Sequence, residues 1–94
     1  MANYLVSYDL VGPKRDYDKI TKHMLTYAPR MKPLESVWIV GSNKTAGEVR
    51  DDVKKHVDTN DMVLVIEVRD LSWGTSNVAK VVTDVMKSVL RPKN

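Results

Sequence analysis

The first strand-like segment of the chain, residues 3–11, carries only one charged side chain. In a strand, successive side chains point to opposite faces. One row is Tyr4, Val6, Tyr8 and Leu10, and the other is Leu5, Ser7, Asp9 and Val11. Because both rows are almost uncharged, the segment is predicted to be a strand whose two faces are both covered. The one acid, Asp9, stands at the far end of the strand, just before the turn that Gly12 and Pro13 predict.

Three other segments have apolar residues at helical spacing, namely residues 16–28, 45–57 and 76–90. Asp16 is a suitable N-cap for the first, and Pro29 ends it. Thr45 and Glu48 have the spacing of a capping box, in which each side chain bonds the backbone amide of the other. The chain is therefore predicted to contain three helices.

Two further segments, residues 31–42 and 61–70, read as strands. Pro33 cannot lie in a central strand, so the early part of 31–42 is an edge or a bend. The segment is either one strand at 36–42 or two short strands that meet near Ser36–Trp38. In 61–70 one face would carry Met62, Leu64, Ile66 and Val68, and the other Val63, Val65, Glu67 and Arg69.

This order predicts one α+β domain over residues 1–94, a ferredoxin-like β-α-β-β-α-β sandwich with an extra C-terminal helix. Helices would cover one face of the sheet. Val63 and Val65, with one row of the first strand, are expected on the other face. An identical subunit in a homodimer is the preferred cover for that face, and the terminal helix is the alternative.

Composition limits the classes of protein and of site. The chain has no cysteine, which excludes disulfides and thiolate metal sites. The sequence shows no secretory signal and no membrane-spanning stretch, so a cytoplasmic protein without membrane partners is expected. The net charge of +3 is mild, but residues 1–33 carry six basic and three acidic side chains. That segment could meet a phosphate backbone, or its charges could simply form a solvated helix face.

The strand "YLVSYDL", the segment "SVWIVGS", the capped helix and the strand "DMVLVIEV" resemble the CRISPR-associated Cas-two family and its SinR-like relatives. The likeness covers roughly residues 3–70. It implies a ferredoxin-like homodimer in which the aspartate ending the first strand lies near the dimer axis. Some members of the family use that pair of aspartates with Mg²⁺ to cut RNA or DNA, whereas others are scaffolds between integrase subunits. The matching residue here is Asp9.

Residues 71–94 depart from the family pattern, because "LSWGTSN" leads into a helix where the family has a short strand. That strand helps to dock the integrase, so an integrase partner is doubtful for this chain. The departure favours a stand-alone relative of the family.

Asp9 has two interpretations. It could be a catalytic metal ligand that holds Mg²⁺ together with its counterpart in a second subunit. Alternatively, it could accept hydrogen bonds from backbone amides of the following turn. Ser7 shares the face of Asp9 and could bond a ligand, although such a serine is more often a small packing residue.

Other candidate binding residues surround the first helix and the 71–77 loop. Four bases could grip phosphates near Asp9: Lys14, Arg15, Lys19 and Lys22. In the loop, Trp73 could stack a base, and Thr75 and Asn77 resemble a polar ligand loop before a helix. An ordinary helix cap is the alternative for that loop.

Other residues receive structural roles. Trp38 is expected in the core or the dimer interface, and Glu67 with Arg69 on the surface. His23 is expected on a solvated helix face and His56 near a helix C-terminus, and neither has a second ligand at zinc spacing.

Two classes of function follow. The first is a homodimeric nucleic-acid-binding protein that acts as a magnesium-dependent endoribonuclease or endodeoxyribonuclease through Asp9, with a toxin-like RNase as a variant. The second is a non-catalytic module that binds nucleotides or proteins, for example a phage-encoded binder that sequesters a nucleotide signal of antiviral defence.

Overall fold

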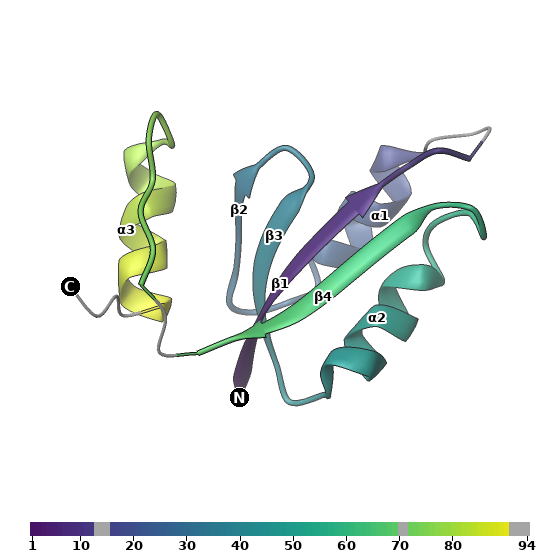
Figure 1. Cartoon of the computed structure of the whole chain (residues 1–94), viewed down its shortest axis with the longest axis horizontal. Helices are drawn as coiled ribbons and strands as arrows, with labels where there is room; N and C mark the ends of the chain where they lie inside the picture. The colour runs from purple at the N-terminus through teal and green to yellow at the C-terminus, as the bar shows by residue number, and fades with distance from the viewer. Residues whose placement is uncertain (13–15, 70–71, 91–94) are drawn as a thin grey trace.

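A computed structural model of the chain describes residues 1–12, 16–69 and 72–90 (Figure 1). Within these residues the chain forms four strands and three helices. In chain order they are β1 (Ala2–Asp9), α1 (Tyr17–Met24), β2 (Arg30–Leu34), β3 (Val37–Ser42), α2 (Ala46–Lys54), β4 (Met62–Val68) and α3 (Lys80–Val89). The order matches the predicted β-α-β-β-α-β arrangement with a further C-terminal helix.

The four strands form one antiparallel sheet in the order β2-β3-β1-β4. β1 therefore lies between two neighbours, and Val6 stands opposite Trp38 of β3 and Val65 of β4. This central position explains why β1 has so little charge, since its backbone and one row of its side chains are shielded from water. The small α+β architecture is compatible with the ferredoxin-like class predicted from the sequence.

The main core lies between the sheet and helices α1 and α2. Its buried side chains come from β1, α1, β3 and α2: Tyr4, Val6, Tyr8, Leu10, Ile20, Met24, Trp38, Val40, Val49 and Val53. The side-chain polar atoms of three core residues are hydrogen-bonded. The Trp38 indole N–H donates to the Tyr8 hydroxyl at 3.0 Å, and the Tyr4 hydroxyl donates to the carbonyl of Lys44 at 2.6 Å. Burial raises the pKa of Tyr8, against the opposing effect of the Trp38 hydrogen bond. Trp38 is therefore a core residue.

Both predicted caps are present. Asp16 accepts a hydrogen bond from the Lys19 amide at 3.1 Å at the start of α1. Thr45 and Glu48 form the capping box of α2, with amide-to-oxygen distances of 3.0 and 3.2 Å. The helices are shorter than predicted, because α1 ends at Met24, α2 ends at Lys54 and α3 begins only at Lys80. None of the described helices is long and apolar enough to cross a membrane.

The segment 31–42 forms two strands rather than one. β2 and β3 are joined by a turn at Glu35–Ser36, and Pro33 lies in β2, which is an edge strand with a register shift between Met31 and Leu34. Proline has no backbone N–H to donate to a neighbouring strand, and an edge strand tolerates this because one of its sides is unpaired.

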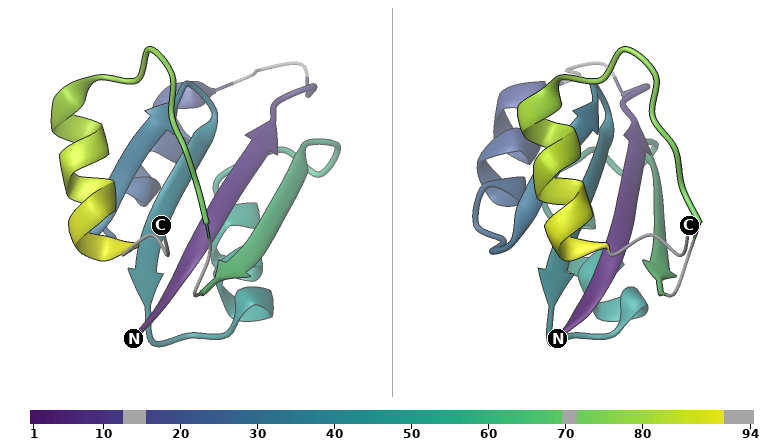
Figure 2. Two further views of the ribbon diagram at one scale, coloured as in Figure 1. Left: turned by 60° about the vertical axis from the view of Figure 1, so that its left-hand side comes forward. Right: turned by 90° about the vertical axis from the view of Figure 1, so that its left-hand side faces the viewer.

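Helix α3 lies on the face of the sheet opposite α1 and α2 (Figure 2). It packs over β2 and β3 through a second cluster of buried side chains, Met31, Ile39, Met86 and Leu90. Only Val68, at the end of β4, packs against this cluster, whereas Met62, Leu64 and Ile66 of β4 are 56, 53 and 48% exposed. The terminal helix thus covers only half of this face.

The prediction that Val63 and Val65 lie on the uncovered face is wrong. Both valines pack against the main core, whereas Met62, Leu64 and Ile66 face away from it. The register with β1 is the reason. Val65 stands opposite Val6 and Val63 opposite Tyr8, and directly paired residues point to the same side of a sheet. We call the uncovered half of the face the open strip; it consists of Leu5, Ser7, Asp9, Met62, Leu64 and Ile66.

Candidate functional site

Asp9 is the last residue of β1 and lies on the open strip. It is exposed, it stands opposite Met62 of β4, and Ser7 precedes it in the same row. Together these residues line a shallow cavity of about 200 Å³ at this end of the sheet. Within the described residues nothing is hydrogen-bonded to the Asp9 carboxylate, so its oxygens face solvent.

The alternative role considered for Asp9, bonding the amides of the following turn, is filled by Asp61. One carboxylate oxygen of Asp61 accepts from the amides of Val11 and Gly12, each at 2.7 Å. The other oxygen accepts from the amide of Asp58, also at 2.7 Å. A single side chain therefore joins the turn after β1 to the turn before β4. This leaves the Asp9 carboxylate free of that structural task.

The predicted basic residues do not share the open strip with Asp9. Lys19 and Lys22 are exposed on α1, which packs on the opposite face of the sheet. Lys19 lines a polar cavity of about 180 Å³ beside Leu10 and three acids, Asp16, Asp58 and Asp61. It is thus at the same end of the sheet as Asp9 but on the other side. Lys14 and Arg15 lie outside the described residues.

Trp73 is half-buried. Its ring packs against the second cluster, and its indole N–H donates to the carbonyl of Leu90 at 3.0 Å. The hydrogen bond fixes the last turn of α3 to the segment that precedes the helix. Trp73 also lines an apolar cavity of about 360 Å³, next to Leu5 and Ile39.

Thr75 and Asn77 lie in the exposed segment before α3. The Thr75 hydroxyl is 3.5 Å from that of Thr83, and Asn77 has a left-handed backbone with φ of 60°. Asparagine tolerates this conformation better than most residues. Helix α3 begins after Ala79 without a side-chain cap. These residues therefore shape the entry into α3, on the same side of the sheet as the open strip but away from Asp9.

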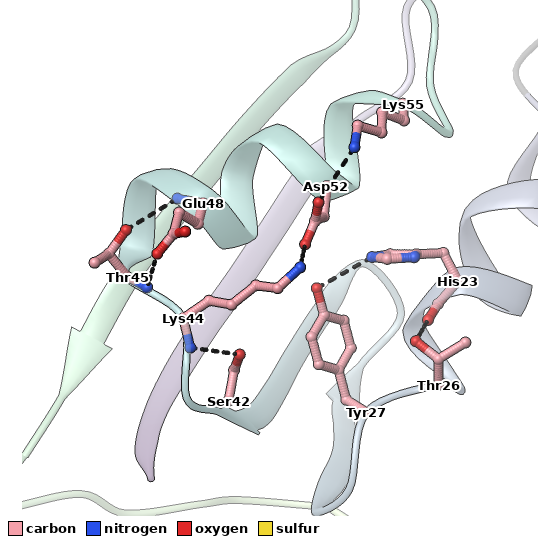
Figure 3. A network of polar contacts seen from close by, with 9 residues as sticks. All are labelled: His23, Thr26, Tyr27, Ser42, Lys44, Thr45, Glu48, Asp52 and Lys55. Atoms are coloured by element: carbon pink, nitrogen blue, oxygen red, sulfur yellow. Dashed lines mark hydrogen bonds and ion pairs between the residues drawn. The ribbon is translucent and has the colours of Figure 1, made fainter.

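The structure brings together a polar cluster that the sequence did not indicate (Figure 3). His23 accepts from, or donates to, the Tyr27 hydroxyl at 3.1 Å, and its ring is stacked on that of His56. Beside them, Lys44 and Lys55 approach Asp52 at 2.5 and 3.5 Å. The expectation that His23 lies on a solvated face is wrong, because it is partly buried between α1 and α2. The four-residue spacing of His23 and Tyr27 could have been recognised in the sequence. The contact between His23 and His56 could not, because these residues are far apart along the chain.

Several pKa values in this cluster are shifted. Burial is the main cause that lowers the pKa of His23, with a smaller effect from His56. The Lys44 hydrogen bond lowers the pKa of Asp52, and burial raises that of Tyr27. The chief role of these contacts is to hold α1, α2 and the loop before α2 together.

Among the described residues no three His, Cys, Asp or Glu side chains are grouped closely enough to hold a metal ion. A cation at Asp9 would therefore need ligands from outside these residues, such as a second copy of the chain. No protein-family model matches the chain, and no solved structure matches it. The likeness to the Cas-two family thus depends on the sequence motifs alone.

Proposed function

We propose that the protein acts as a homodimer that binds nucleic acid and cleaves it with Mg²⁺, held by Asp9 of both subunits. The observation that supports this is the composition of the open strip. Leu64 and Ile66 are 53 and 48% exposed there, in the same half-face as an aspartate without a structural partner among the described residues. Apolar rows of this kind mark sites of association.

The strip is suited to pairing with a copy of itself. If a two-fold axis ran between the two sheets, parallel to the strands and over the gap between β1 and β4, the apolar rows of the copies would meet, and the two Asp9 side chains would lie at the same height. Sheets packed face to face are about 10 Å apart, a gap that two facing aspartates nearly span. The carboxylates could then share one cation.

Asp9 fits Mg²⁺ as a ligand because this cation prefers carboxylate oxygens, retains several waters and needs few protein ligands. The ion would activate water and stabilise charge on the phosphate. The chain's own contribution would be to hold the carboxylate at a strand end, where Asp61 fixes the adjoining turn. Lys19 and Lys22, exposed on α1, would contact phosphates further along the substrate.

Two measurements test the proposal. In sedimentation equilibrium the wild type should be a dimer and Leu64→Lys a monomer, while Val81→Lys, placed on the 70% exposed Val81 of α3, should stay dimeric. In a cleavage assay with labelled RNA and DNA, Asp9→Asn should lose activity by about 10²-fold or more. Asp51→Asn, an exposed acid on α2, is the matched control. Cleavage that survives Asp9→Asn contradicts the catalytic role.

The same experiments distinguish the second candidate, a non-catalytic binding module. This function is supported by the small number of metal ligands. Each chain supplies a single free carboxylate at the open strip, and no three side chains among the described residues are grouped to hold a metal ion. A wild-type dimer that binds RNA, DNA or a small nucleotide with salt-dependent affinity but shows no turnover favours this function.

A further inference from the structure

The two histidines of the chain meet between the ends of α1 and α2. His23 lies in the last turn of α1, and His56 follows Lys55, the C-cap residue of α2. Their ring centroids are 4.3 Å apart, and the ring planes are inclined by only 18°. The rings are therefore stacked face to face, an arrangement that suits neutral imidazoles.

The charged and titratable groups around this pair come from every neighbouring element. The cavity that His56 lines contributes Asp16, Lys19, Asp58 and Asp61. Tyr27, from the segment after α1, is hydrogen-bonded to His23. Asp52 and Lys55 come from α2 and its C-cap, and Lys44 from the loop before α2 (Figure 3). Asp52, the acid that acts on His23 within the described part of the chain, is thus already engaged by two lysines. A protonated His23 would gain little from Asp52 and would face the positive charges of Lys44 and Lys55.

Protonation of His23 is therefore unfavourable in the folded protein. Partial burial is the largest cause that lowers the pKa of His23, His56 adds to it, and Asp52 opposes it. Because the fold favours the neutral imidazole, this contribution to stability is complete above the ordinary histidine pKa of about 6.5. It is lost as the pH falls through the lower pKa of the folded state.

We propose that the stacked His23–His56 pair is a pH-sensitive contact, closed when the His23 ring is neutral and opened when that ring is protonated. Opening would separate the C-terminal ends of α1 and α2. His56 also lines the polar cavity beside Asp58 and Asp61, and Asp61 holds the turn after β1. The contact lies between the two helices, away from the open strip, so it does not depend on dimer formation.

Proton NMR tests the proposal directly, because the chain has only two histidines and each gives its own imidazole signals. The His23 signal should titrate with a midpoint below about 6.5, and this midpoint should rise in His56→Gln. The NOE between the two rings should be present at pH 7.5 and lost at pH 5.

Thermal unfolding between pH 7.5 and pH 5 gives a second readout. The wild type should lose several degrees of Tm, and His23→Gln should lose less, while Lys22→Gln, a neighbouring exposed residue of α1, should behave as the wild type. A His23 midpoint at or above 6.5, or one that His56→Gln leaves unchanged, would overturn the proposal. If His56→Gln does not fold, the wild-type midpoint and the ring NOE still decide the question.

Discussion

Removing the carboxylate of the partly buried Asp61 should destabilise the protein more than removing an exposed acid such as Asp51. Its two oxygens accept three backbone amides at 2.7 Å, from Val11, Gly12 and Asp58. A hydrogen bond to a charged group contributes about 1.5–3 kcal/mol when it is shielded. Val11 is exposed, so its amide can turn to water, and only the bonds to Gly12 and Asp58 are partly buried.

Counting only the two partly buried bonds, at the low end of that range, Asp61→Ala should lower the free energy of unfolding by about 3 kcal/mol. For a domain of this size, that corresponds to a fall in Tm of roughly 10–20 °C. Asp61→Asn should lose less, about 1–2 kcal/mol, because it keeps one oxygen for Val11 and Gly12. The side-chain NH2 of the asparagine would then face the backbone N–H of Asp58, so that two hydrogen-bond donors oppose each other.

Urea unfolding followed by circular dichroism, at one fixed protein concentration, measures these differences. Asp51→Ala removes an exposed acid of α2 that pairs with Arg50, and it should change stability by no more than about 0.5 kcal/mol. The reasoning is refuted if Asp61→Ala is as mild as Asp51→Ala, or if the asparagine variant is the less stable of the two Asp61 variants.

Three further predictions concern local contacts and pH. Thr45→Ala should remove the α2 cap and lower the free energy of unfolding by about 1 kcal/mol, as urea titration would show, and an unchanged midpoint would argue against the capping box. Gly12→Ala should cost roughly 1–3 kcal/mol, because the new Cβ would lie 2.7 Å from Asp58 Cβ; full wild-type stability would show that the turn can shift. The pKa values of Glu48 and Asp52 are lowered by hydrogen bonds from Thr45 and Lys44. Their contribution is present above about pH 4.5 and is lost as the pH falls through the lower folded pKa values, so Tm should drop again below pH 4.5, and a flat profile there would be inconsistent with these shifts.

Local signals in the sequence were enough to predict much of the fold. Asp16 and Thr45 mark helix starts because a cap acts within three residues of itself. The uncharged rows of residues 3–11 predicted a strand covered on both faces, and β1 is central in the sheet with Tyr4, Val6 and Tyr8 buried. The prediction is wrong for the other row, because Leu5, Ser7 and Asp9 lie on the open strip. Helix ends were less predictable, since apolar spacing continues beyond the last hydrogen-bonded turn.

Long-range register could not be predicted from these signals. Both rows of β4 are apolar near Val63, so only its pairing with Tyr8 decides which row faces the helices. The bond from Asp61 to Val11 joins residues 50 positions apart. The stacking of His23 on His56 likewise depends on how α1 and α2 pack. The position of Asp9 at a strand end was predictable. That Asp9 does not bond the amides of the following turn was not, because it depends on Asp61 accepting those amides from a distant part of the chain.

The central claim is that a second copy covers the open strip and brings the two Asp9 side chains face to face. The chain has no cysteine, so a spin label on Asp9→Cys gives a single distance between subunits. Pulsed EPR should find that distance on the order of 10–20 Å, because sheets packed face to face are about 10 Å apart. A label on Lys54→Cys, on the far side of the sheet, should give a clearly longer one. No coupling between Asp9 labels at high protein concentration, or a distance as long as that from Lys54, would contradict the account.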